Sequence, residues 1–383
     1  MKKRHFLLAL VLLITFTGGF FAGFSYNKQQ PIENLTIDKV SPSGKQPEVK
    51  QSPEIKQEQS KVLIGYVQDF RDPDVVDYDK LTHVIFSFAH PTKDGHLLMN
   101  GESALKNLRK MVIKAHKQDT KAILAIGGWY HISGGESYDY FKSAITNTQS
   151  RTKLINELVS IAEREKLDGI DIDFEHPRSR EDAKNLALFT KALSIKLHKA
   201  EIELSIAVNA KVHSVAGTEI NNVVYNSSMF QHVDHVNIMA YDGHWDGSYN
   251  AANLSPYSYN ENIVKYWTNL FEQNNISKDK LVLGVPFYAQ PEDPSIKQIS
   301  YETIINKDPA NASQDTVKLN GTTYHYNGEI TVQKKTKLAL DYGFGGMMVW
   351  EAGHDSKGEH SLTSVISNVL TNANLVAVKD TTN

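Results

Sequence analysis

The chain contains the sequence Asp168-Gly169-Ile170-Asp171-Ile172-Asp173-Phe174-Glu175, in which acidic and apolar side chains alternate. Residues two apart in a β-strand point to the same side, so Asp171, Asp173 and Glu175 share one face. The apolar residues between them take the other face, where they can pack against covering helices. We therefore predict a buried parallel strand whose three carboxylates face the axis of a barrel.

Seven more short runs of β-branched and apolar residues occur along the chain. They lie at residues 62–67, 83–88, 122–126, 203–208, 235–239, 281–285 and 346–350. Amphipathic helical patterns separate them. Together with the strand at 169–174, they predict the α/β class and a (β/α)8 TIM barrel. A doubly wound open sheet is the alternative; it predicts a glycine-rich phosphate turn, and the sequence contains no GxGxxG.

A short insertion is predicted between the seventh and eighth strands, in the segment between Tyr288 and Phe344. Within it, alternating residues at 317–330 flank the dipeptide Asn320-Gly321. Asn-Gly is typical of a tight turn between two antiparallel strands, so this stretch predicts a β-hairpin.

The amino-terminal sequence predicts export. Lys2, Lys3 and Arg4 precede an apolar run at 6–24, so residues 1–26 are expected to be a signal peptide or an N-terminal membrane anchor. Residues 27–60 lack aromatic side chains and are rich in Lys, Gln, Glu, Ser and Pro, which predicts a disordered linker. The barrel domain is expected at 61–375 and a C-terminal tail at 376–383. The protein would then be extracellular, either secreted or held at the membrane only by residues 6–24.

Composition excludes several kinds of partner and site. The 383 residues carry a formal net charge of -3 with no long block of Lys or Arg, so nucleic acid is not expected as a partner. Cysteine is absent, which excludes disulfides, thiolate metal sites and cysteine nucleophiles. The histidines form no HExxH motif, so we predict no metal and no cofactor. A monomer is expected.

The three stacked carboxylates indicate chemistry, because like charges so close together cannot all ionise. A solvated acidic edge strand would instead need polar residues in place of Ile170, Ile172 and Phe174. Glu175 is the last of the series, at the strand end where barrel active sites lie. A carboxyl group with a raised pKa suits a general acid that protonates a leaving oxygen, as in glycoside hydrolysis. The pattern alone leaves open whether Asp173 assists Glu175 or whether a carboxylate acts as nucleophile.

Aromatic and polar residues gather at the ends of the other predicted strands. These candidate binding residues are Tyr66, Gly128, Trp129, Met239, Tyr241, Asp242, Trp245, Tyr288 and Trp350. A single Tyr or Trp is more often a core residue, but this shared placement indicates a surface that stacks on sugar rings and binds their hydroxyl groups. Trp267 lies in an apolar helical pattern instead and is predicted to be core.

With these residues the chain resembles the family 18 glycoside hydrolases, which are chitinases and endo-β-N-acetylglucosaminidases. The resemblance covers the domain from about residue 61 to residue 370. The family motif DxxDxDxE is matched by Asp168, Asp171, Asp173 and Glu175. The motif MxYD is matched by Met239, Tyr241 and Asp242. The motif GGxMxW is matched by Gly345, Gly346, Met348 and Trp350.

The resemblance implies a substrate-assisted reaction with net retention, in which the sugar's 2-acetamido oxygen attacks its own anomeric carbon. Glu175 would act as the acid and then as the base for water. Asp173 would orient the acetamide N–H, and Asp171 would hold Asp173.

The resemblance also implies a subsite around the acetamide group. Tyr241 would bind the acetamide oxygen, Asp242 and Met239 would line the same subsite, and Trp350 would form its floor. Asp168, which precedes the alternating triplet, is expected to have a structural role.

Three positions depart from the family pattern. Ala125 replaces the serine of the SxGG motif, so Tyr66 is expected to carry more of the contact with Asp171. His176 stands where a tyrosine commonly follows the acid, and Ala289 stands where the seventh-strand motif has glycine. The short insertion predicts a shallower cleft and endo-type cleavage with low processivity.

The expected substrate is chitin or an N-acetylglucosamine-containing glycan, with soluble oligomers or amorphous chitin favoured because no carbohydrate-binding module is seen. An endo-β-N-acetylglucosaminidase acting on the chitobiose core of N-glycans is the enzymatic alternative. A non-catalytic chitin-binding lectin is another, although such relatives usually lack the acid, which is present here as Glu175. An anchored adhesion protein would leave the buried carboxylates unexplained.

Overall fold

The computed structural model describes the backbone of residues 61–380 and the side chains of residues 61–373. The predicted leader or anchor at 1–26 and the predicted linker at 27–60 lie outside the described residues. Within the described part of the chain, no helix is both long enough and apolar enough to cross a membrane.

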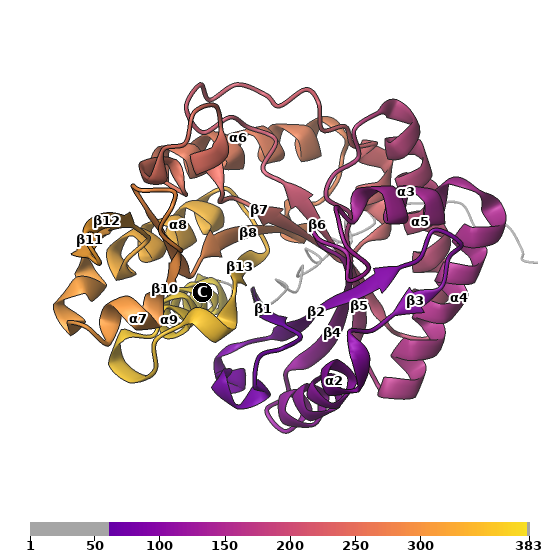
Figure 1. The fold of residues 1–383 in the computed structure, drawn as a ribbon, viewed down its shortest axis with the longest axis horizontal. Helices are drawn as coiled ribbons and strands as arrows, with labels where there is room; N and C mark the ends of the chain where they lie inside the picture. Colours follow the sequence, from indigo (N-terminus) through magenta and orange to yellow (C-terminus); the bar gives the residue numbers. More distant parts are fainter. Residues whose placement is uncertain (1–60, 381–383) are drawn as a thin grey trace, which may run out of the picture. The chain divides into compact units, whose positions relative to one another are not determined.

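Eight parallel strands close into a barrel, which confirms the predicted (β/α)8 fold (Figure 1). In chain order they are β1 (Val62–Gln68), β2 (His83–Pro91), β4 (Lys121–Gly127), β5 (Gly169–Asp173), β6 (Glu203–Asn209), β7 (His235–Met239), β8 (Leu281–Pro286) and β13 (Gly346–Trp350). Strand β1 pairs in parallel with both β2 and β13, and this double pairing closes the sheet. A short strand, β3 (Leu97–Leu98), adds an antiparallel extension to β2.

Helices cover the outside of the barrel (Figure 1). They are α2 (Gly101–His116), α3 (Tyr138–Thr146), α4 (Thr148–Glu165), α5 (Arg180–Lys199), α6 (Tyr257–Gln273), α8 (Glu329–Asp341) and α9 (Leu362–Asp380). In α4 the side chain of Asn147 caps the first turn by accepting from the Ser150 N–H at 2.9 Å, and Leu154, Leu158 and Ile161 are buried toward the barrel. Helix α9 extends beyond residue 375, where the domain was predicted to end.

Two connections replace the expected α-helix with 3-10 turns. Between β1 and β2 the chain forms η1 (Pro73–Val75) and η2 (Tyr78–Lys80), and between β6 and β7 it forms η3 (Ser227–His232). Six more 3-10 segments lie in later connections. They are η4 (Gly243–Trp245), η5 (Ala251–Asn253), η6 (Lys278–Lys280), η7 (Pro309–Ser313), η8 (Ala352–His354) and η9 (Gly358–His360).

The predicted insertion between the seventh and eighth barrel strands forms a small antiparallel sheet in the order β10-β9-β12-β11. Its strands are β9 (Tyr288–Pro291), β10 (Ile299–Ser300), β11 (Thr316–Leu319) and β12 (Thr322–His325), and it also contains the short helix α7 (Tyr301–Ile305). Asn320 and Gly321 join β11 to β12 with φ angles of 53° and 79°. A two-residue hairpin turn with both φ values positive favours Asn-Gly, and the predicted hairpin is confirmed.

The barrel interior has an apolar side and a polar side. Val62, Ile64, Val282 and Met348 belong to a separate buried cluster to which β1, β2, β4, β8 and β13 contribute. Strands β5, β6 and β7 instead place acidic, hydroxyl and amide side chains inside, because their alternate residues are polar. This polar side holds the carboxylates predicted from the sequence.

Candidate active site

Both carboxylate oxygens of Asp171 accept hydrogen bonds from other strands. The residue is fully buried, and the Tyr66 hydroxyl donates to its Oδ2 at 2.8 Å. On Oδ1 it accepts from the Ser205 hydroxyl at 2.6 Å and from the Asn237 amide at 3.3 Å. Burial raises the pKa of Asp171 to about 6, and these hydrogen bonds oppose part of that rise.

The sequence predicted the contact from Tyr66 but missed Ser205 and Asn237. Ala125 on β4 and Ser205 on β6 flank Asp171 at the same level of the sheet. The hydroxyl group that Ala125 lacks is therefore supplied from the opposite neighbouring strand. Aligning the strands from their first residues would have shown that Ser205, like Asp171, is the third residue of its strand.

Asp173 and Glu175 complete the acidic series toward the open end of the barrel. Asp173 is 3% exposed, and its Oδ1 has no hydrogen-bond partner among the described residues. Burial and the charges of Glu175 and Asp171 hold the pKa of Asp173 well above its usual value. Burial, together with the charge of Asp242, raises the pKa of Glu175 to about 8. Glu175 is thus protonated near neutral pH, and its side chain remains 17% exposed, so it can deliver a proton to a bound molecule.

Two glycines bring the end of β4 against the acidic strand. Gly127 and Gly128 have φ angles of +122° and +77°, and the Gly128 N–H donates to the Asp173 carbonyl at 2.9 Å. A Cβ atom on Gly127 would lie 2.0 Å from that carbonyl oxygen, and one on Gly128 would lie 2.7 Å from the Phe88 ring. Only glycine therefore fits at these two positions.

Trp350 forms an aromatic surface at the end of β13. Its ring stacks on Phe88 with centroids 5.9 Å apart and an interplanar angle of 22°, and it meets the Tyr66 ring at 5.7 Å. Trp350 itself is only partly buried. Its free face can therefore receive an apolar face of a sugar ring.

The segment after β7 adds polar groups to the same end of the barrel. Tyr241 is buried, with its hydroxyl 3.9 Å from the Met348 sulfur. Asp242 is exposed and accepts a hydrogen bond from the Tyr288 hydroxyl. Met239, the last residue of β7, is partly buried and packs against the inner apolar cluster. The structure thus gathers the residues of the predicted acetamide subsite.

The remaining predicted aromatics differ in position. Trp129 is 40% exposed and lies beside His176, with ring centroids 6.4 Å apart, so it borders the acidic strand. Trp245 is 64% exposed and packs on Tyr249 at 5.0 Å rather than on a residue of the acidic series. Trp267 is fully buried, which confirms its prediction as core.

Asp168 lies at the opposite end of the strand from Glu175. Its Oδ2 accepts from the Ala122 N–H at 2.7 Å and is 2.8 Å from His116 Nε2. These contacts join β4 and α2 to the start of β5, which fits the expected structural role.

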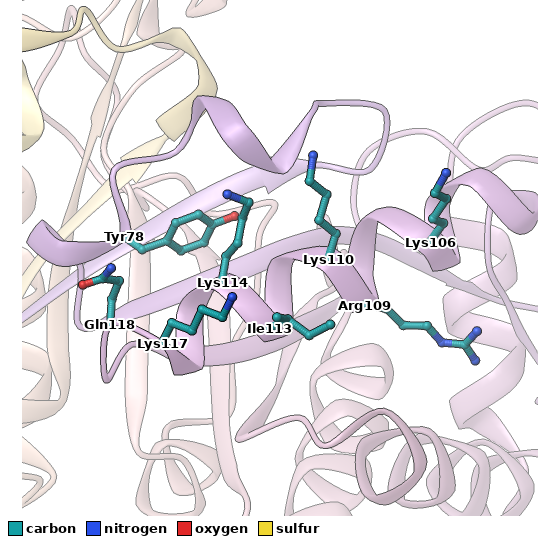
Figure 2. A pocket seen from close by; sticks show the side chains of 8 residues that line it. All are labelled: Tyr78, Lys106, Arg109, Lys110, Ile113, Lys114, Lys117 and Gln118. Atoms are coloured by element: carbon teal, nitrogen blue, oxygen red, sulfur yellow. The ribbon is translucent and has the colours of Figure 1, made fainter.

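A separate surface hollow lies beside α2 (Figure 2). It is lined by Tyr78, Lys106, Arg109, Lys110, Ile113, Lys114, Lys117 and Gln118. Lys110 and Lys114 pair with Asp74 at 2.8 and 2.7 Å, and Arg109 pairs with Glu165 at 2.7 Å. This hollow contains none of the predicted site residues, and most of its positive charge is compensated.

Known proteins are similar to this chain in sequence and in fold. The profile of the glycosyl hydrolases family 18 matches residues 57–355. Chitinase 1 of Aphanocladium album is 24% identical over 78% of this chain and 81% of its own length. A chitinase-like effector of Moniliophthora roreri is 29% identical over 56% of this chain, and the match spans 54% of that relative.

A solved structure extends the comparison to three dimensions. The GH18 chitinase ChiB from the chitin utilization locus of Flavobacterium johnsoniae superposes with a TM-score of 0.68 at 25% identity, over 82% of this chain and 95% of that chain. The family profile covers most of the barrel domain. The chain therefore belongs to glycosyl hydrolases family 18, a glycoside hydrolase family.

Proposed function

We propose that the protein hydrolyses β-1,4-linked N-acetylglucosamine chains with retention of configuration, using the substrate's own acetamide oxygen as nucleophile. The arrangement of Asp171, Asp173 and Glu175 carries this proposal. The two aspartates lie behind Glu175 on one strand, whereas a conventional retaining enzyme places its two carboxyl groups on either side of the scissile bond. One acid and an internal nucleophile fit this layout better than two opposed carboxylates do.

In the first step, Glu175 donates its proton to the leaving oxygen while the acetamide oxygen attacks the anomeric carbon. Asp173, whose Oδ1 is free of partners among the described residues, accepts a hydrogen bond from the acetamide N–H. When the proton shared by the two carboxyl groups lies on Glu175, Asp173 carries the negative charge, which also stabilises the positive oxazolinium intermediate. In the second step, Glu175 takes a proton from water, which then opens the intermediate.

Sugar binding follows from the groups around this strand. The free face of Trp350 supports the ring that bears the acetamide group, and the Tyr241 hydroxyl donates to the acetamide oxygen. Trp129 and Trp245 are exposed on loops after β4 and β7, where they can stack on further rings of a chain. Similarity to Chitinase 1 of Aphanocladium album and to ChiB supports chitin as the substrate class.

We further propose endo-type cleavage with low processivity. The insertion after β8 is small: it contributes a four-stranded sheet with short strands and the five-residue helix α7. A cleft bordered by so small a unit leaves a long polymer free to dissociate between cleavage events. Release of mainly disaccharide along crystalline chitin would contradict this assignment.

The proposed chemistry is tested by Glu175→Gln, assayed with a fluorogenic chitobioside or chitotrioside. Loss of the acid should lower kcat at least ~10²-fold. Glu272→Gln, at a surface ion pair with Lys278, is the matched control and should retain wild-type activity. If the wild type does not cleave, or if Glu175→Gln keeps its rate, the enzymatic assignment fails.

The same assay separates the alternatives. Because one relative is a chitinase-like effector, binding of chitin oligomers without cleavage must be excluded. Cleavage of an N-glycoprotein in preference to chitin oligomers would instead favour an endo-β-N-acetylglucosaminidase. Export also remains a proposal and is tested by locating the mature protein and sequencing its first residues.

A further inference from the structure

Two histidines and a glutamate converge at the amino-terminal end of the barrel, opposite Glu175. His83 begins β2, Glu203 begins β6 and His235 begins β7. One potential ligand atom from each lies within 4.8 Å of the other two. His83 Nε2 is 3.1 Å from Glu203 Oε2, and the rings of His83 and His235 meet edge to face with centroids 5.0 Å apart.

We propose that this cluster binds one divalent transition-metal ion, with Zn²⁺ the best fit. Zinc takes imidazole nitrogen and carboxylate oxygen at about 2.0–2.2 Å in tetrahedral geometry, which places two ligand atoms roughly 3.3 Å apart. The pair formed by His83 and Glu203 already has this spacing. Since the three ligand atoms lie within 4.8 Å of one another, the His235 atom needs to move by no more than about 1.5 Å to match it.

The state of His235 is an independent indication of a ligand. The residue is 6% exposed, and its Nδ1 is fully buried with no hydrogen-bond partner among the described residues. Buried polar atoms nearly always have a partner, and a bound metal ion would supply one.

Neighbouring residues orient the other two ligands. The Thr82 hydroxyl can donate to the Leu63 carbonyl at 3.1 Å and accept from His83 Nδ1 at 2.7 Å. In this tautomer, which an ion would select, Nε2 is free to bind metal; without an ion, Nε2 can instead donate to Glu203 Oε2 at 3.1 Å. Lys121 donates to Glu203 Oε1, so Oε2 remains available to the cluster. Such contacts are typical of the groups that hold metal ligands in position.

An ion at this place would connect β2 to β6 and β7, two neighbouring strands to which β2 is not hydrogen-bonded. Strands β4 and β5 lie between β2 and β6 in the sheet order. Glu203 is 23% exposed, which gives an ion a route from solvent. Since the amino-terminal end of a barrel serves stability, we assign the ion a structural rather than a catalytic role.

The test uses the full-length chain without a histidine tag, stripped with EDTA and titrated with ZnCl₂. We expect one Zn²⁺ per chain by calorimetry and a rise in Tm of about 5 °C at a hundredfold excess over Kd. CoCl₂ should give the intense visible absorption of a tetrahedral site. Chitin-oligomer hydrolysis should change less than about twofold, because the cluster is remote from the catalytic end.

His235→Phe removes one ligand while keeping a ring of similar shape, and it should weaken Zn²⁺ binding at least ~100-fold. Glu203→Gln, which preserves side-chain size, should do the same. His198→Gln removes a surface histidine that pairs with Asp234 at 2.9 Å, and it should leave Zn²⁺ affinity unchanged. Absence of 1:1 binding by the wild type, or wild-type affinity in either ligand variant, would overturn the proposal.

Discussion

The Tyr66 hydroxyl donates a 2.8 Å hydrogen bond to Oδ2 of Asp171, across the barrel interior from β1 to β5. The same hydroxyl accepts from the Asn237 amide at 2.9 Å, and Ser205 donates to the other carboxylate oxygen. Asp171 therefore has no freedom to rotate toward or away from Asp173. These hydrogen bonds connect β1, β5, β6 and β7, and they fix the position of the Asp171 carboxylate next to Asp173 and Glu175.

Removal of the Tyr66 hydroxyl should impair catalysis more than folding. A hydrogen bond to a charged group contributes about 1.5–3 kcal/mol, so Tyr66→Phe should lower kcat by at least ~10-fold. Tyr326→Phe loses a comparable hydrogen bond, to the Asn311 carbonyl at 2.7 Å, away from the acidic series, and its kcat should not change. Steady-state kinetics on a chitin oligomer distinguish the two variants; equal rates would show that Asp171 needs no support from β1.

A serine hydroxyl should support Asp171 either from β6 or from β4. We expect Ser205→Ala to lower kcat about 10-fold, because one donor to Oδ1 is lost. Ala125 pairs with Asp171 from the opposite strand, so Ala125→Ser in the Ser205→Ala background should restore part of that loss. A double variant as slow as Ser205→Ala, with an unchanged Tm, would argue against this compensation.

The pH dependence of the reaction should report Glu175. Because its pKa is raised to about 8, the acid form is present below that pH and is lost above it. We expect kcat/KM to fall about tenfold per pH unit above pH 8. A pH profile measured between pH 5 and 10 checks this, and a decline beginning below pH 6 would contradict the assignment.

The same carboxyl group should reduce stability at alkaline pH. The pKa of Glu175 is about 8 in the folded chain against a usual value of 4.5, so between these values the folded state binds more protons than the unfolded state. Stability contributed by the protonated group is therefore lost as pH rises from 4.5 to 8. Glu175→Gln should raise Tm relative to the wild type more at pH 9 than at pH 4, as thermal unfolding at the two pH values would show.

A buried ion pair should be costly to break. Glu351 is fully buried; its Oε1 accepts from Arg71 Nε and Nη2 at 2.8 and 2.6 Å, and its Oε2 accepts from the Gln68 N–H at 3.0 Å. Arg71→Met leaves this carboxylate without a countercharge and should lower the free energy of unfolding by about 3–5 kcal/mol.

A surface pair provides the control for that measurement. Lys278 and Glu272 lie 2.7 Å apart with side chains 32% and 55% exposed, so Lys278→Met should cost no more than about 1 kcal/mol. Chemical denaturation of both variants tests the difference. Equal losses in the free energy of unfolding would show that the buried pair of Arg71 and Glu351 stabilises the fold no more than a surface pair does.

Local sequence patterns predicted the strands, the hairpin and the acidic series. Alternation places Asp171, Asp173 and Glu175 on one face whatever surrounds them, because the pleat of a strand has period two. Asn320-Gly321 favours positive φ at two successive residues, which specifies a tight turn without help from the rest of the fold. These properties depend only on neighbouring residues, so they could be predicted from the sequence.

Contacts across the barrel depended on the tertiary structure. A hydroxyl group can reach Asp171 either from position 125 on β4 or from Ser205 on β6. The register of these two strands against β5 makes both positions neighbours of Asp171. The convergence of His83 and His235, like the pairing of Arg71 with Glu351, joins residues far apart in the chain whose meeting depends on barrel closure. Alternation determines the side of a strand on which a residue lies, whereas strand register and barrel closure determine the residue it meets.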